Sequence, residues 1–210
     1  MKLIALSAGI VVAASIAGCA SPERSRDMAN PNTSPQTLAA QVCSNCHGLD
    51  GNSISPNFPR LAAQQKNYLV EQLKSFRSHN RADPAGFEYM WGLSRSLTDS
   101  QIDGLADYYL RQKPLPAAAA DSSLVASGRT IYEQGNAERS IPPCASCHGP
   151  QAQGSEQFPR LAGQHADYVV KQLNVFQRTD ERPEGSVMKV IAHGMTPSDM
   201  VNVAAYLQTQ

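Results

Sequence analysis

The pattern Cys-x-x-Cys-His occurs twice in this chain of 210 residues and limits what the chain can fold into. Two thiols three positions apart can form thioether bonds to the two vinyl groups of one porphyrin, and the histidine that follows can bind the iron. A thioredoxin-like redox pair would need a βαβ setting, and a zinc site would need four converging ligands. We therefore expect two covalently attached haem c groups. Their attachment residues are Cys43 and Cys46 with His47, and Cys144 and Cys147 with His148.

The two halves of the chain also match outside this pattern. The sequence Phe-Pro-Arg-Leu-Ala stands at 58–62 and again at 158–162. Similarity over this length indicates a tandem duplication of one fold. Pro114 and Pro116, followed by four alanines, mark a linker. We assign 37–113 to a first domain, 114–122 to the linker and 123–210 to a second domain. Further matched pairs are Tyr68 and Tyr168, Gln72 and Gln172, Leu73 and Leu173, Phe76 and Phe176, Met90 and Met188, and Tyr108 and Tyr206.

Each half is predicted to be helical. Apolar residues recur at helical spacing over 64–78 and 164–177, and first helices are expected at 36–42 and 123–134. Thr98 and Thr196 are capping signals for the last helix of each half, with Pro197 in the first helical position. No stretch alternates polar and apolar residues over the length of a strand. The predicted fold class is all-α.

A methionine is expected to fill the sixth coordination position of each iron. Met90 and Met188 occupy corresponding places, each ahead of the capped last helix. A thioether is a soft, neutral ligand that favours ferrous iron, and His/Met ligation raises the reduction potential. With both axial positions taken by protein, outer-sphere electron transfer is favoured over chemistry on a bound substrate. Met195 and Met200 align with apolar residues and are expected in the core.

Several other residues are candidates for supporting the cofactors. Pro59 and Pro159 lie on a loop that must return across the haem, where a backbone carbonyl can accept the Nδ1 proton of the histidine. Arg60 and Arg160 come next and can reach haem propionates. The remaining histidines have no histidine at the matching position, so we expect them on the surface or in loops: His79, His165 and His193.

The N-terminal segment is typical of an export signal. Lys2 is followed by an apolar stretch, and small residues precede Cys19 as in a bacterial lipobox. We expect 1–18 to be a lipoprotein signal peptide, Cys19 to be a lipid anchor, and the Ser-, Pro- and Asn-rich stretch 19–36 to form a tether. Ala20, in place of an aspartate, favours the outer membrane. The balance of 18 basic and 18 acidic side chains gives no indication of nucleic-acid binding.

Longer phrases of the sequence resemble the dihaem cytochrome c4 family of class I c-type cytochromes. They lie at 47–53, 58–62, 141–150 and 161–164, and the likeness covers both halves from Thr37 onward. The resemblance implies two class I cytochrome c domains related by a pseudo-twofold axis, with haem propionates meeting at the interface. It also implies His/Met ligation in both domains. Ala63 departs from the pattern, since the second half and the family have glycine at this place.

In this resemblance His47 pairs with Met90, and His148 pairs with Met188. Family members transfer electrons in the periplasm, which implies redox partners such as a cytochrome bc-type donor and a haem–copper terminal oxidase as acceptor. A cytochrome subunit of a larger dehydrogenase or oxidase would share these sites and stays an alternative. A dihaem enzyme such as a peroxidase would need an open iron position and an acid–base pair above it. Both halves keep the methionine and align no such pair, so we expect no enzymatic activity and no small-molecule substrate.

Overall fold

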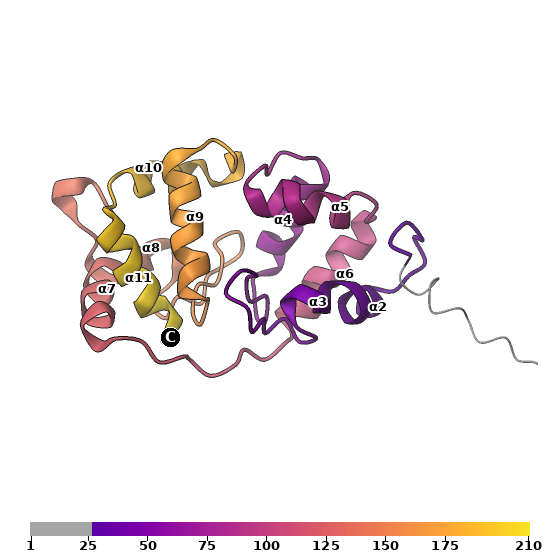
Figure 1. Ribbon diagram of the computed structural model, residues 1–210, viewed down its shortest axis with the longest axis horizontal. Helices are drawn as coiled ribbons and strands as arrows, with labels where there is room; N and C mark the ends of the chain where they lie inside the picture. Colours follow the sequence, from indigo (N-terminus) through magenta and orange to yellow (C-terminus); the bar gives the residue numbers. More distant parts are fainter. Residues whose placement is uncertain (1–26) are drawn as a thin grey trace, which may run out of the picture.

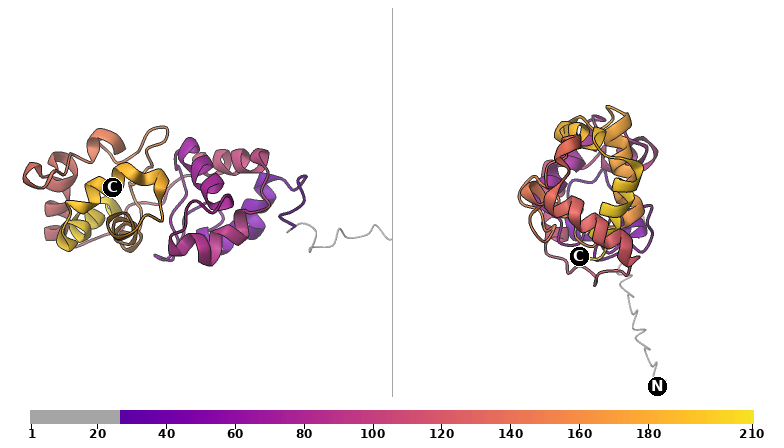
Figure 2. Two further views of the ribbon diagram at one scale, coloured as in Figure 1. Left: turned by 90° about the horizontal axis from the view of Figure 1, so that it is seen from above. Right: turned by 90° about the vertical axis from the view of Figure 1, so that its left-hand side faces the viewer.

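The computed structural model describes residues 27–210, whose helices form two lobes placed side by side (Figure 1). The elements α2 to α6 build the first lobe and α7 to α11 build the second, while the chain between them runs along one edge of the molecule. Seen from above, the pair of lobes is elongated (Figure 2). The described residues form no strand and only two isolated bridges. The predicted all-α tandem fold is confirmed.

The first lobe begins with three short helical elements that lead without a break into the first Cys-x-x-Cys-His pattern. Ser34 caps the first of them, because its side chain accepts a hydrogen bond from the Thr37 backbone N–H. A longer helix then crosses the lobe, and a short π-helical turn and one more turn of helix precede the last helix. These elements are α2 (Pro35–Leu38), η1 (Ala39–Cys43), α3 (Ser44–His47), α4 (Lys66–Arg77), η2 (Gly86–Met90), α5 (Trp91–Ser94) and α6 (Asp99–Leu110).

The second lobe repeats this plan with two differences. A loop separates its first helix from the second Cys-x-x-Cys-His pattern, and one helix replaces the π-helical turn and short helix of the first lobe. The elements are α7 (Ser122–Gln134), η3 (Ala137–Arg139), α8 (Ala145–His148), α9 (Ala166–Arg178), η4 (Pro183–Gly185), α10 (Ser186–His193) and α11 (Pro197–Gln208).

Capping boxes start the last helix of each lobe, as the sequence predicts. The Thr98 side chain accepts from the Gln101 N–H while the Gln101 side chain accepts from the Thr98 N–H, and Thr196 and Asp199 form the same reciprocal pair. Pro197 occupies the first turn of α11. A cap of this kind contributes about 1 kcal/mol. It fixes the start of the helix that covers each core, since α6 packs against α2 and α4, and α11 packs against α7 and α9.

Each lobe has a hydrophobic core of its own. Ile102 and Leu105 are fully buried in the first, and Tyr132 and Met200 in the second. Met195 is also buried in the second core, so both methionines expected there are confirmed as core residues. Because neither core includes residues of the other lobe, each lobe has its own apolar surroundings for a cofactor.

The stretch 27–36 differs from the tether expected for it. Thr33 is buried, and the Gln101 side chain donates from Nε2 to the carbonyls of Asn30 and Thr33, at 3.1 and 3.0 Å. The polar composition of this stretch does not reveal that a glutamine on α6 forms hydrogen bonds with its backbone carbonyls. The predicted signal peptide and Cys19 lie outside the described residues. Between residues 27 and 210, no helix is long and apolar enough to cross a membrane.

The linker is tied to both lobes. Asn52 of the first lobe accepts a hydrogen bond from the Leu115 N–H at 2.9 Å. Gln208 of the second lobe donates from Nε2 to the Ala119 carbonyl at 3.2 Å. These contacts hold the connecting chain against the pair of lobes and limit how far the lobes can move apart.

Candidate haem-attachment sites and the interface between the lobes

The two predicted ligand histidines are held in the same way in both lobes. His47 ends α3 and His148 ends α8, and each Nδ1 donates to a proline carbonyl, 2.9 Å away at Pro59 and 3.0 Å away at Pro159. A carbonyl oxygen can only accept, so Nδ1 carries the proton and Nε2 keeps a free lone pair. Burial lowers the pKa of both imidazoles, and the proline carbonyls oppose this effect. The result is a neutral, oriented imidazole of the kind that binds a metal.

A tight turn after each pattern brings the proline loop back over the histidine. Gly48 and Gly149 have φ of 77° and 80°, a left-handed conformation that glycine adopts without steric strain. In the first lobe the Gly51 carbonyl then accepts hydrogen bonds from the N–H groups of residues 61 and 62, at 2.7 and 3.2 Å. In the second lobe the Ala152 carbonyl accepts from residues 161 and 162, at 2.8 and 2.9 Å. The turn therefore fixes the position of each proline carbonyl.

None of the four cysteines of the two patterns forms a disulfide within the described residues. Burial raises the pKa of the Cys43 thiol to about 11, and it raises the pKa of the Cys144 thiol to about 11 as well. Cys43 packs against the first core and Cys144 against the second, whereas Cys147 is exposed. Each pattern thus offers one thiol at the core, and this arrangement fits a porphyrin held at one edge by a pair of thioethers.

In the first lobe, aromatic rings connect the segment of Met90 to the histidine. The Phe58 ring lies edge-to-face with the rings of His47 and Tyr89, at centroid distances of 6.3 and 5.9 Å. Tyr89 directly precedes Met90, which ends η2 and is half-buried. The structure therefore brings the predicted ligand segments of this lobe together. Ligation of the iron by Met90 remains a prediction.

The second lobe keeps the contact between the phenylalanine and the histidine, but Val187 precedes its methionine where the first lobe has a tyrosine. The Phe158 ring lies edge-to-face with His148 at a centroid distance of 6.3 Å. Met188 lies on α10, is half-buried and packs against the core that Cys144 also contacts. Ligation by Met188 likewise remains a prediction.

The two arginines expected near propionates both lie at the interface between the lobes. Arg60 donates from Nη1 to the Gly163 carbonyl of the other lobe at 2.9 Å, so part of its guanidinium serves the interface. Arg160 has a buried Nε–H without a hydrogen-bond partner among the described residues, and burial lowers its pKa. A buried cationic donor of this kind fits a carboxylate supplied by a haem. Propionate binding by both arginines stays a prediction.

Two glutamines pair the lobes in a reciprocal way that sequence reasoning missed. Gln64 accepts from the Arg160 N–H at 2.6 Å and donates to the Arg160 carbonyl at 2.9 Å. Gln164 accepts from the Arg60 N–H at 2.9 Å and donates to the Arg60 carbonyl at 3.0 Å. Each glutamine side chain is therefore hydrogen-bonded to both the backbone N–H and the backbone carbonyl of one arginine in the opposite lobe. The sequence does contain a sign of this pairing, because Gln64 and Gln164 end a stretch that is repeated in both halves and that includes the matched arginines.

A buried polar cluster forms a second contact between the lobes. Arg81 donates to Gln72 at 2.5 Å and to Gln172 at 3.3 Å, and Arg182 donates to the same two glutamines at 2.9 and 2.6 Å. Asp83 accepts from Arg81 at 3.0 Å and from Gln172 at 3.2 Å. Burial opposes ionisation of Asp83, but the Arg81 guanidinium outweighs it, and the pKa of this carboxyl lies below its usual value.

In this cluster the arginines of the two lobes have nearly the same surroundings, whereas the carboxylates of the two lobes do not. The Arg81 guanidinium lies 4.4 Å from the Phe76 ring centre, and Arg182 lies 4.6 Å from that of Phe176. Glu184, the counterpart of Asp83, pairs with Arg182 at 2.9 Å, but its Oε2 is buried and has no hydrogen-bond partner in the part of the chain from residue 27 onward. The matched arginines were missed because the repeat shifts by one residue between the phenylalanines and the arginines.

His165 lies in a loop, at the residue before α9, but it is not on the surface. His165 is buried, and its Nε2 lies 2.8 Å from the Ser53 carbonyl of the other lobe. It was expected on the surface or in a loop because it has no partner in the repeat, and position in the repeat does not report contacts across an interface. His79 and His193 are exposed, as predicted.

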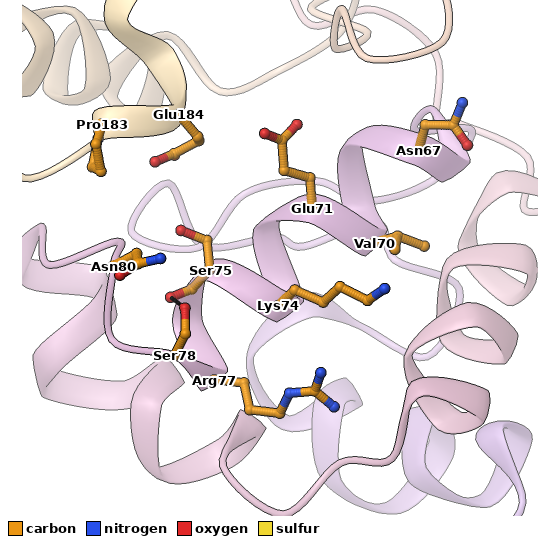
Figure 3. Close-up of a pocket in the computed structure, with 10 residues that line it drawn as sticks. All are labelled: Asn67, Val70, Glu71, Lys74, Ser75, Arg77, Ser78, Asn80, Pro183 and Glu184. Atoms are coloured by element: carbon orange, nitrogen blue, oxygen red, sulfur yellow. Dashed lines mark hydrogen bonds between the residues drawn. The ribbon is translucent and has the colours of Figure 1, made fainter.

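An open groove of about 820 Å³ lies where α4 meets η4 of the other lobe. Figure 3 shows Glu71, Lys74 and Arg77 projecting from α4, with Pro183 and Glu184 across from them. The lining is polar and of mixed charge. No residue of either Cys-x-x-Cys-His pattern contributes to it, so this groove is separate from the candidate haem sites.

Comparisons with known proteins agree with this arrangement. The model of the family "Cytochrome c" matches residues 35–112 and again 125–210. Cytochrome c4 of Azotobacter vinelandii is 37% identical over 80% of this chain and 84% of its own length. A thiosulfate dehydrogenase electron acceptor of Stutzerimonas stutzeri is 36% identical over 80% of this chain and 78% of its own length.

A solved structure gives the same result for the arrangement in space. Cytochrome c4 of Acidithiobacillus ferrooxidans, 39% identical, superposes with a TM-score of 0.75 and covers 80% of this chain and 98% of its own. The match spans both lobes and therefore includes their relative placement. Together with two matches to one family model, it shows that the chain belongs to the cytochrome c family, as a dihaem electron-transfer cytochrome of the c4 type with two covalently bound haem c groups.

Proposed function

We propose that this chain relays single electrons between two partner proteins, using one haem in each lobe. The observation that carries this proposal is the equivalence of the two lobes around the histidine. In both, Nδ1 donates to a proline carbonyl, and a half-buried methionine lies in the helical segment that precedes the last helix. If His47 with Met90 and His148 with Met188 held the two irons, no coordination position would be left for a substrate, and the haems would supply electron exchange alone.

In this proposal the cysteines and axial residues have distinct tasks. The thiols of Cys43 and Cys46, and of Cys144 and Cys147, fix the porphyrins, so that neither cofactor can dissociate. His47 and Met90 hold the first iron, and His148 and Met188 hold the second. When bound, haem supplies one-electron exchange between ferrous and ferric iron. The proline carbonyls of residues 59 and 159 keep each imidazole ring in one orientation while the charge on the iron changes.

The interface gives the relay a fixed geometry. The reciprocal bonds of Gln64 and Gln164 and the buried cluster around Arg81 and Arg182 join the lobes through groups that are almost fully removed from water. The rate of electron transfer between two centres depends on their separation, so a steady rate needs a constant separation. A polar, hydrogen-bonded interface provides it, because each bond is satisfied in only one arrangement of the lobes.

We propose that the protein works in the periplasm. Its electron donor there would be a cytochrome bc-type complex, and its acceptor would be a haem–copper oxidase. Cys19 would hold the chain at a membrane through its lipid, with the outer membrane favoured. Replacing Cys19→Ser is expected to move the protein from the membrane to the soluble periplasmic fraction. Continued membrane association of the variant would count against lipidation.

A second candidate is electron acceptance from a thiosulfate dehydrogenase. The likeness to a relative described as an electron acceptor of that enzyme supports it. The two candidates predict different donors, so the test is to mix the oxidised protein with each in turn. Fast reduction by a purified thiosulfate dehydrogenase with thiosulfate, and none by a bc-type complex, would favour the second candidate. Failure to pass electrons to any partner, despite two reducible haems, would contradict both.

A further inference from the structure

His165 donates one of the hydrogen bonds that join the two lobes. Its Nε2 lies 2.8 Å from the Ser53 carbonyl of the first lobe, and both residues are buried. Because a carbonyl oxygen only accepts, Nε2 carries the proton in this contact, and Nδ1 is the nitrogen that can take up a second one. Ser53 lies in the turn that follows the first Cys-x-x-Cys-His pattern. The bond therefore connects this turn to the start of α9 in the second lobe.

The repeat contains an uncharged version of the same contact. Gln65 occupies the place of His165 in the first lobe, and its Nε2 donates to the Gln153 carbonyl of the second lobe at 2.9 Å. A side-chain amide does not titrate, whereas an imidazole changes its charge between about pH 5 and pH 8. The two lobes thus make the same kind of contact with each other, once through a titratable group and once without one.

Three features of its surroundings disfavour a positive charge on His165. The residue is 9% exposed, so protonation would create a cation where little water can solvate it. The Arg60 guanidinium is close, because its Nε lies 3.5 Å from the same Ser53 carbonyl that His165 contacts. His165 is also the N-cap residue of α9, and the N-terminal end of a helix carries a partial positive charge.

Two groups act in the opposite direction, and neither outweighs the burial. Asp167 lies in the first turn of α9 but is exposed, so solvent screens its charge. Burial lowers the pKa of His165, with a smaller contribution from Arg60, whereas the Ser53 carbonyl and Asp167 oppose this shift. A haem propionate bound to Arg60 would offset the charge of that arginine, but it would not remove the burial of the ring or the effect of the helix end.

We propose that His165 is a positioning residue that holds the lobes together in its neutral form and weakens their contact when it becomes protonated. Protonation places two cations, His165 and Arg60, beside one buried carbonyl, and separation of the lobes returns the imidazolium to water. Docking is then strongest above about pH 6.5, and below it each pH unit lowers the docking equilibrium constant by up to about tenfold until the folded-state pKa is reached. The inference rests on the proposed function only where it links the placement of the lobes to electron exchange.

Hydrogen exchange of the reduced holoprotein, followed by NMR, tests the proposal. The N–H groups of Arg60 and Arg160 are bonded to glutamine side chains across the interface, so their protection from exchange reports separation of the lobes. After correction for the intrinsic exchange rate, this protection should fall by up to about tenfold per pH unit below about pH 6.5. The N–H of Leu105, inside α6 and remote from the interface bonds, should keep its protection.

His165→Gln gives the second lobe the residue that the first lobe has at the matching position. The variant keeps a donor but cannot titrate, so the protection of the two arginine N–H groups should not depend on pH between about 5 and 7.5. His193→Gln is the matched control, because it removes an exposed histidine of the same lobe and should keep the wild-type pH dependence. His47 and His148, as predicted iron ligands, do not titrate in the holoprotein over this range.

Constant protection in wild type from about pH 7.5 to about pH 5 would overturn the proposal, and this outcome needs no variant. A His165→Gln protein with the same fall as wild type would also overturn it, because the titrating group would then lie elsewhere. Electron passage at about pH 7.5, where His165 is neutral, separates both outcomes from failure of the proposed function. A protein that takes electrons into both haems and passes them to a partner at this pH stays a carrier, whatever its interface does in acid.

Discussion

Removing the side chain of Gln164 is expected to weaken the docking of the two lobes. This side chain is 6% exposed and makes two hydrogen bonds to Arg60 in the other lobe, at 2.9 and 3.0 Å. Each such bond contributes roughly 1 kcal/mol, and the variant also leaves the Arg60 N–H and carbonyl without partners. Together these effects predict a loss of about 2–4 kcal/mol for Gln164→Ala.

The matched change on the other side of the pseudo-twofold axis is Gln64→Ala. Its bonds to Arg160 are of similar length, at 2.6 and 2.9 Å, so a similar loss is expected. Both glutamines and the arginines that they contact line one small cavity, so their effects are expected to be coupled. The double variant is therefore expected to lose more interface free energy than either single variant. The lobes should then separate as far as the linker allows.

Small-angle X-ray scattering and urea unfolding of the holoprotein check this expectation. The double variant should have a larger radius of gyration, and its single unfolding transition should split into two. Gln65→Ala is the control, because this half-buried side chain makes one solvent-exposed inter-lobe bond, to the Gln153 carbonyl at 2.9 Å, and its loss should cost less than about 1 kcal/mol. A double variant with unchanged scattering and one unfolding transition would refute the role given to the glutamines.

Three further predictions concern stability and are checked by urea unfolding. Ala63 has a left-handed φ of 54°, which is strained for alanine, so Ala63→Gly should stabilise the protein by about 0.5–1 kcal/mol. Gly163→Ala, at φ 72° and with only ordinary van der Waals contacts for the added Cβ, should cost about 1 kcal/mol, and opposite signs would contradict the strain argument. Asp83→Ala leaves the Arg81 guanidinium buried without its carboxylate partner, with an expected cost of about 3–5 kcal/mol, and a neutral effect would show that this ion pair is dispensable. The pKa of Asp83 is lower in the folded state than in the unfolded state. The stability that this carboxylate contributes is therefore present above about pH 4 and is lost as the pH falls through the folded-state pKa. Between about pH 7 and pH 3, wild type should lose more stability than Asp83→Ala.

The fold could be predicted from the sequence because its signals are local. Helical spacing, the capping boxes at Thr98 and Thr196, and the repeat each depend on residues that lie close together in the chain. The position of Pro59 relative to His47 also follows from a short turn. In each case the structure has the predicted element or contact.

The interface could not be predicted in this way. Contacts such as those of Gln164 with Arg60, or of His165 with Ser53, join residues far apart in sequence, and no periodicity reports them. The polar composition of 27–36 predicts a tether for a related reason, since it does not reveal that the Gln101 side chain donates hydrogen bonds to two backbone carbonyls of this stretch. The sequence also does not indicate that the Tyr109 hydroxyl is buried without a hydrogen-bond partner among the described residues.

The most direct test is the near-infrared spectrum of the oxidised protein, in the region of the weak sulfur-to-iron charge-transfer band. Wild type should show the band with the intensity of two His/Met haems. Met90→Ala and Met188→Ala should each lose about half of it, because each removes one of two equivalent sulfur ligands. A wild-type spectrum with a high-spin haem, or a variant that keeps the full band, would contradict methionine ligation in that lobe and with it the assignment as a pure electron carrier.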